Sequence, residues 1–287
     1  MAYVSIDEQY LKQWVGRQER QRDRLTLAPL NALAATLDRE ERGYVAGASV
    51  PALWHWLYFL PIARQSAISS DGHPQRGGFL PPVSLPRRMW AGGRLRFYDA
   101  LPVDAEVERL STILDVSHKS GRSGDLVFVK VRHELSHAGD VLVREEQDIV
   151  YRDPPRPGDP LPAPQAAPER AKWSREVVPD PVLLFRYSAL TFNGHRIHYD
   201  RPYAMHDEGY PGLVVHGPLI ATLLMNLLRD ELPQARVVGF SFRAVRPLFD
   251  TRAFRVCAKP EANGSSIQLW AEDADGFLCM DAQAELA

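Results

Sequence analysis

A proline-rich stretch divides this chain into two parts. Residues 153–169 read DPPRPGDPLPAPQAAPE. Proline fixes the φ angle and has no backbone N–H to donate, so such a segment runs extended and outside any packed core. The sequence therefore predicts a linker at 153–169 between two units, residues 1–152 and 170–287.

The unit after the linker begins with a short polar region that we expect to be a loop. Residues 218–228 are apolar on nearly every side and end before Pro233, which predicts a helix buried in a core. Four strand patterns follow, at 237–245, 253–259, 266–272 and 278–285, with turn signals at 263–264 and 273–276.

The unit before the linker repeats this order. An apolar segment at 50–62 leads into a loop at 71–86 that is rich in glycine and proline. Strand patterns then occur at 89–98, 105–116, 126–136 and 141–151, with turns at 121–124 and 138–140. We infer an α+β fold in which each unit wraps an antiparallel sheet around one buried helix.

Composition narrows the class of protein. Hydrophobic residues make up 45% of the 287, enough for a substantial core, and the formal net charge of −2 gives no electrostatic case for nucleic acid. The polar, acidic start is not a targeting segment, and the apolar run at 54–62 is too short for a bilayer. Cys257 and Cys279 are too few for a disulfide framework and are expected to be buried thiols. These features predict a cytoplasmic protein.

Polar chemistry is concentrated in two neighbouring segments, TFNGHRIHYD at 191–200 and GLVVHGP at 212–218. His198 has an intrinsic pKa near 6.5, about right for taking and returning a proton at cellular pH. The predicted helix that starts at Pro218 offers backbone N–H groups to a developing negative charge, and Gly217 allows close approach. The two segments together indicate an acid–base enzyme that acts on a carbonyl compound.

These segments resemble the signature of the MaoC-like dehydratases and (R)-specific enoyl-CoA hydratases, S/T-G-D-x-N-P-x-H-x-D followed by a histidine–glycine pair at a helix start. Residues 51–56 and 79–93 resemble the N-terminal half of a subgroup with two hot-dog domains. That subgroup holds 3-hydroxyacyl-thioester dehydratases and itaconyl- and mesaconyl-C4-CoA hydratases. The resemblance implies a double hot-dog fold over the whole chain. Its first unit (1–152) would have a degenerate site and shape the acyl pocket, and its second (170–287) would carry the catalytic motif.

The resemblance also assigns roles. His198 falls on the family's catalytic histidine, and Gly217 on the glycine whose N–H faces the thioester oxygen. Asn193 falls where the wider family has a catalytic aspartate, and a carboxamide cannot take up a proton near neutral pH. His198 then has to carry the proton transfer, with Asp200 as a candidate orienting partner. His216 is either a hydrogen-bonding residue at the helix entry or a catalytic group.

Arginines near the motif suggest anion binding. Arg196, Arg243 and Arg246 could bind the phosphates of CoA or a second carboxylate, and the alternative is that they are solvated or in structural pairs. His195 and His198, with His206 or His216, have the spacing of a metal site, but no cysteine or glutamate pattern reinforces it. No G-x-G-x-x-G follows a strand. We expect no metal and no cofactor other than the CoA of the substrate.

The favoured function is a hydro-lyase that adds or removes water across an α,β-unsaturated acyl-CoA, with mesaconyl-C4-CoA or itaconyl-CoA as substrate. One alternative is a 3-hydroxyacyl-thioester dehydratase of fatty-acid synthesis, acting on CoA or acyl-carrier-protein esters. Another is a non-catalytic acyl-thioester-binding subunit, which Asn193 favours, and a third is a thioesterase. An acyl-CoA is the expected partner, without nucleic acid or membrane. Because hot-dog sheets usually associate, we also expect a homodimer.

Overall fold

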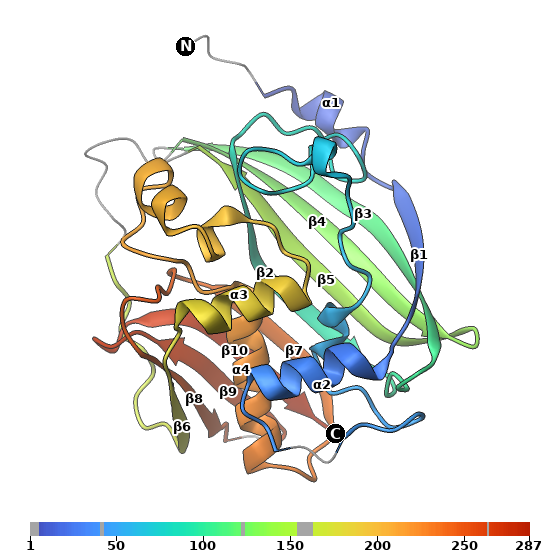
Figure 1. The fold of residues 1–287 in the computed structure, drawn as a ribbon, viewed down its shortest axis with the longest axis vertical. Helices are drawn as coiled ribbons and strands as arrows, with labels where there is room; N and C mark the ends of the chain where they lie inside the picture. The colour runs from blue at the N-terminus through green and yellow to red at the C-terminus, as the bar shows by residue number, and fades with distance from the viewer. Residues whose placement is uncertain (1–5, 41–42, 122–123, 154–162, 263) are drawn as a thin grey trace.

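A single antiparallel sheet runs through the protein. The computed structural model describes residues 6–40, 43–121, 124–153, 163–262 and 264–287. Within these ranges ten strands pair in the order β1-β3-β4-β5-β2-β7-β10-β9-β8-β6 (Figure 1). The first half contributes β1 (Gln18–Arg24), β2 (Arg87–Phe97), β3 (Glu106–Gly121), β4 (Gly124–His137) and β5 (Asp140–Arg152). The second contributes β6 (Trp173–Val177), β7 (Val237–Ala244), β8 (Phe254–Pro260), β9 (Ser266–Glu272) and β10 (Leu278–Leu286).

The two halves meet edge to edge where β2 pairs with β7. Gly92 lies opposite Arg243 in this pair, and a Cβ at Gly92 would lie 2.6 Å from the carbonyl oxygen of Phe242. The glycine therefore permits the close approach of the two edge strands. The result is the expected α+β double hot-dog, with its two five-stranded sheets joined into one.

Helices gather on one side of this sheet (Figure 1). They are α2 (Leu27–Thr36), α3 (Pro181–Leu190) and α4 (Gly217–Glu231), while α1 (Glu8–Lys12) packs on β3. The helix predicted at 218–228 is confirmed as α4, whose side chains lie in the main core. No helix of the described ranges is long and apolar enough to cross a bilayer.

Eight strands predicted from alternating polarity are confirmed, and β1 and β6 were missed. Both missed strands lie at the edges of the sheet, and β1 reads QERQRDR, which has no apolar face to reveal it. The prediction of a polar loop after the linker is wrong, because residues 173–190 hold β6 and α3.

The thiols of Cys257 and Cys279 are buried and unbonded, and burial raises the pKa of each to about 12.

The predicted helix at 50–62 is also wrong. Only η1 (Trp54–Leu57), a single 3₁₀ turn, forms there, and Leu53 and Phe59 on either side have φ angles of 70° and 54°, outside the right-handed helical region. Its side chains are held individually: Trp54 donates to Asn226 of α4, and Trp56 donates to the buried carboxylate of Glu145. The apolar run at 50–62 is therefore not the counterpart of α4 in the second half.

Most of the predicted linker, residues 154–162, lies outside the described residues. Residues 122–123 and Asn263, which belong to two predicted turns, also lie outside them. The last part of the linker is bound to the second half: Leu278 N–H donates to the Gln165 carbonyl, and Ala166 bridges to Phe277. The predicted boundaries of the two units stay a prediction.

A loop of the first half, residues 69–76, packs against the second half where Gly72 meets Gly194. Gly72 has a φ of +90°, and a Cβ there would lie 1.8 Å from the carbonyl oxygen of Gly194. The backbone N–H of Arg196 donates to the Asp71 carbonyl at 2.9 Å. This crossing brings the loop at 69–76 onto the polar motif at 191–200.

We expect Gly72→Ala to destabilise the protein more than Gly77→Ala does. Gly77 has the same φ of +90°, but its added Cβ would meet only Pro82 Cβ, at 3.6 Å. The control change should therefore cost only the left-handed conformation, about 1–2 kcal/mol. Gly72→Ala adds a backbone clash and should cost about 3 kcal/mol or more. Chemical denaturation measures both, and equal losses would show that the crossing is not tightly packed.

Candidate active site

The polar motif begins at the end of α3. Helix α3 is capped by Asp180 at its start and closes in a double hydrogen bond: Asn193 N–H donates to the Ser188 carbonyl, and Phe192 N–H to that of Ala189. This is the Schellman pattern, which needs a left-handed residue after the last turn. Phe192 occupies that position with a φ of 49°, although glycine is usual there. Such a strained residue is typical of a functional segment, and here it turns the chain toward the motif.

His198 is buried, and one of its nitrogens is already engaged. It ends the short turn η3 (Arg196–His198), and its Nδ1 lies 2.7 Å from the Val214 carbonyl oxygen. A carbonyl only accepts, so Nδ1 carries the hydrogen and Nε2 is the basic nitrogen. The partner that orients His198 is therefore Val214, and the expectation that Asp200 does so is wrong.

His216 joins His198 to the start of α4. The two imidazoles stack with centroids 3.7 Å apart and planes at 18°. His216 is the N-cap of α4, and its Nε2 lies 2.8 Å from Ser188 Oγ on α3, while its buried Nδ1 has no hydrogen-bond partner among the described residues. The next residue is Gly217, where an added Cβ would meet no described atom within 4 Å. Open space therefore lies beside Gly217, at the start of α4 and next to the histidine pair.

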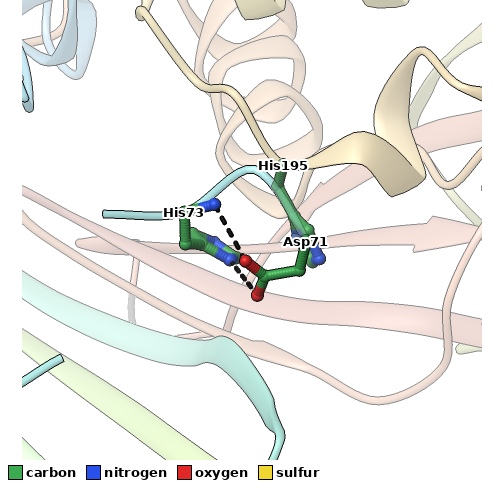
Figure 2. A group of neighbouring side chains, drawn as sticks. All are labelled: Asp71, His73 and His195. Carbon is green, nitrogen blue, oxygen red and sulfur yellow. Dashed lines mark hydrogen bonds and ion pairs between the residues drawn. The ribbon is translucent and has the colours of Figure 1, made fainter. Parts of the chain in front are cut away.

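The crossing loop adds an aspartate–histidine pair that was not predicted (Figure 2). Asp71 accepts from His73 twice, from its backbone N–H and from Nδ1, both at 2.9 Å. The His73 ring packs on His195 with centroids 4.1 Å apart, and His195 meets His198 edge-on at 5.5 Å. Four of the nine histidines thus form a continuous row. The Asp-Gly-His sequence at 71–73 was the only available signal, and nothing in it indicated contact with residue 195.

Burial keeps this row of histidines neutral. It lowers the pKa of His198 to about 4 and that of His195 to about 2, and it lowers those of His73 and His216 as well. The other imidazoles and nearby arginines lower several of these further. For Asp71, burial acts in the opposite direction, but the hydrogen bonds from His73 outweigh it and hold the pKa of the carboxyl well below its usual range. The site offers neutral bases beside one fixed carboxylate.

Asn193, Asp200 and Arg196 are engaged within the motif. Asn193 Oδ1 accepts from the His195 N–H at 3.0 Å, which shapes the turn before His198. Arg196 donates to Asp200 through Nε and Nη2, to the Ser70 carbonyl through Nη1, and stacks over the Tyr203 ring. The guanidinium predicted to bind substrate is therefore committed to the loop crossing.

Arg243 and Arg246 are also away from the histidine row in their contacts. On β7, Phe242 lies in the main core, and successive side chains of a strand point to opposite faces, so Arg243 lies on the outer face, where it is 3.9 Å from Asp281. Arg246 pairs with Asp273 at 3.3 Å and lies over the Phe277 ring. Arg243 and Arg246 thus lie in structural pairs with aspartates, which was the stated alternative to substrate binding.

A metal ion would find one candidate group. The ligand atoms of Asp71, His73 and His195 lie within 4.8 Å of one another (Figure 2). The predicted alternative, His195 and His198 with His206 or His216, does not form such a group among the described residues. The expectation of no metal stays a prediction.

Comparison with known proteins identifies the family of this chain. The profile of the hydroxyacyl-thioester dehydratase type 2 family matches residues 53–250, which hold both the crossing loop and the motif. The chain belongs to this family. It is 52% identical over 276 residues to the mesaconyl-C(4)-CoA hydratase of Chloroflexus aurantiacus, covering 95% of this chain and 96% of that one. It is 29% identical to the mitochondrial hydroxyacyl-thioester dehydratase type 2 of Schizosaccharomyces pombe, over 84% of this chain and 90% of that one.

Solved structures agree on the fold of this dehydratase family member. The MaoC-like dehydratase of Phytophthora capsici superposes with a TM-score of 0.72 at 13% identity, over 98% of this chain and 99% of that one. HtdX of Mycobacterium tuberculosis superposes with a TM-score of 0.65 at 16% identity, over 94% and 100%. The double hot-dog fold, the family and the close relative make the chain an enzyme of the hydro-lyase type.

We expect His198 to stay neutral well below the pH at which an ordinary histidine titrates. At pH 5.5 an unshifted imidazole would be about 90% protonated, whereas His198 should remain in its Nδ1–H form. Two-bond ¹H–¹⁵N spectra of histidine-labelled protein measure this, with His198→Gln for assignment. Since its folded-state pKa lies below the unfolded value, its contribution to stability is full above pH 6.5 and is lost as the pH falls toward 4. A midpoint near 6.5 would contradict the burial argument.

Proposed function

We propose that this hydro-lyase hydrates mesaconyl-C4-CoA, a methyl-branched dicarboxylic enoyl thioester. The single observation that carries the substrate is the 52% identity over 95% of the chain to a mesaconyl-C(4)-CoA hydratase. Itaconyl-CoA, also expected from the sequence, is a second dicarboxylic candidate. The dehydration of 3-hydroxyacyl thioesters is the alternative, favoured by the family profile and the yeast relative.

The reaction follows from two groups. Neutral His198 Nε2 takes a proton from water as the water oxygen bonds to the β-carbon. The electrons of the double bond move to the thioester oxygen, where the N–H of Gly217 stabilises the negative charge, and loss of such a donor costs on the order of a hundredfold in rate. The imidazolium then gives its proton to the α-carbon, and neutral His198 is restored.

Three features support this assignment. His198 has one nitrogen fixed by Val214 and the other basic. It stacks on His216, directly before Gly217, so base and N–H lie at neighbouring positions. Its lowered pKa keeps it unprotonated at neutral pH, the form that a base requires. Asn193 has its oxygen occupied by the His195 N–H, so we assign it the positioning of the motif rather than proton transfer.

The substrate assignment is tested with a panel of thioesters. We expect the wild-type protein to consume mesaconyl-C4-CoA, followed at the enoyl-thioester absorbance band, with a higher kcat/KM than a linear C8 enoyl-CoA. The reverse order would remove the dicarboxylate assignment and favour the fatty-acid dehydratase. A thiol-reactive dye run in parallel would reveal a thioesterase.

His198→Ala should lower kcat by about 100-fold or more, because the proton-transfer group is lost. His137→Ala is the matched control, since His137 ends β4 and, within the described ranges, its ring makes one hydrogen bond, with the Glu106 carbonyl oxygen at 2.8 Å. It should leave turnover unchanged. If His198→Ala retains wild-type turnover and fold, another group is the base, and a wild-type protein that binds acyl-CoA without turnover would favour the non-catalytic subunit.

Treatment with a chelator should leave hydration unchanged. The proposed mechanism places the oxyanion on a backbone N–H and the proton on an imidazole, so neither step uses a metal. Metal analysis of the purified protein and turnover after EDTA dialysis measure this. Loss of activity that zinc restores would instead assign Asp71, His73 and His195 to a metal ion.

We also propose, from the sequence, a homodimer in the cytoplasm. The expectation of a dimer comes from the tendency of hot-dog sheets to associate, and the expectation of location comes from the two cysteines, which are buried and unbonded. Light scattering of the purified protein gives the oligomeric state.

A further inference from the structure

Beside the histidine row lies a polar cavity whose role is not explained by the proton transfer. It has a volume of about 430 Å³. The side chains that surround it come from the crossing loop, the start of β2 and the turn η4 (Tyr203–Asp207) with the residue after it, and they include Asp71, His73, Arg76, Arg88 and Glu208. Since His73 also packs on His195, the cavity borders the site.

The charges that line this cavity do not cancel. Glu208 is neutralised by Arg87, whose Nη2 lies 2.8 Å from its carboxylate. Arg76 gives its N–H groups to the uncharged carbonyls of Val83, Leu85 and Pro86, so its positive charge is not neutralised by them. Arg88 makes no ion pair within the described part of the chain. Two arginines thus face one remaining carboxylate, that of Asp71.

The excess positive charge changes the pKa values of the neighbouring groups. Burial lowers the pKa of the Arg76 guanidinium, and the nearby charge of Arg88 lowers it further. Burial likewise lowers the pKa of His73, and Arg88 and Arg76 add to that effect against the influence of Asp71. Half-buried cations that lack enough counter-charge attract an anion of complementary shape.

We propose that Arg88, with the charge of Arg76 behind it, binds the free carboxylate of a dicarboxylic acyl thioester. This inference rests on the proposed function and names the group that selects the substrate. Arginine suits the task because its planar guanidinium binds a carboxylate through two parallel hydrogen bonds.

The chemistry of the substrate places the carboxylate where the cavity lies. In mesaconyl-C4-CoA the free carboxylate is bonded to the β-carbon, the atom to which water adds. A group that binds it must therefore lie next to the base that activates water. Arg88 lines the same cavity as His73, His73 packs on His195, and His195 contacts His198. Arg196, Arg243 and Arg246 are less suited to bind the carboxylate, since each already lies against an aspartate.

Phosphates of CoA present the same anionic chemistry, and a binding experiment separates the two sources. Succinyl-CoA is a saturated analogue with a carboxylate on the β-carbon, and butyryl-CoA has a methyl group in its place. Titration calorimetry should show wild-type protein binding succinyl-CoA on the order of tenfold tighter than butyryl-CoA. Arg88→Gln should abolish that difference and leave butyryl-CoA affinity unchanged. Arg88→Lys should restore part of it.

The matched control is Arg22→Gln, at an arginine that is 82% exposed on edge strand β1, and it should retain the preference. Equal weakening of both ligands by Arg88→Gln would overturn the proposal, because the charge would then serve the phosphates. An unchanged preference in a folded Arg88→Gln protein, with thermal melting as the check, would overturn it too. Because binding is read without turnover, an Arg88-dependent preference in a protein that fails to hydrate mesaconyl-C4-CoA would support the subsite while removing the proposed reaction.

Discussion

The site depends on the contact between Gly72 and Gly194. Two backbones cross there at a distance that admits no side chain on either residue. The crossing is tied by the hydrogen bond from Arg196 N–H to Asp71 and by the guanidinium of Arg196, which reaches the Ser70 carbonyl. Without this contact, Asp71 and His73 would belong to a surface loop, and the motif would lose one wall. Asp200 holds the Arg196 guanidinium by two hydrogen bonds, and the same guanidinium bonds to Ser70. The pair of Arg196 and Asp200 thereby helps to fix the motif to the first half.

Burial then determines what the assembled residues can do. A histidine in water is half protonated near pH 6.5, whereas His198 and His195 are kept neutral far below that pH by their surroundings. Each neutral imidazole needs a defined tautomer, and the Val214 carbonyl supplies it for His198. The stack of His198 on His216 places this base next to the opening at Gly217. A neutral base beside backbone N–H groups is suited to a reaction whose negative charge appears on the substrate.

Local patterns predicted much of the fold and part of the site. Alternating polarity located eight strands, and the apolar run at 218–228 located α4, because burial of one face is written into the sequence. Edge strands β1 and β6 have little to bury, so no pattern marks them. The apolar run at 50–62 misled for a related reason. Hydrophobicity records that the segment is buried, but left-handed Leu53 and Phe59 and the hydrogen bonds of Trp54 and Trp56 decide that it is not a helix.

The arginines show the same limit at the site. Arg196 and Arg246 lie near the motif in sequence, yet both are held by aspartates, whereas Arg88 reaches the histidines from β2, more than a hundred residues away. Its charge acts on His73 and His195, two members of the histidine row that leads to His198. Burial lowers the pKa of His73 and His195, and the charge of Arg88 lowers both further and so helps to keep them neutral. A carboxylate bound to Arg88 would cancel that effect and make the imidazoles more basic. A dicarboxylic substrate would thereby raise the pKa of two histidines in the row that leads to His198, and a monocarboxylic acyl group would not.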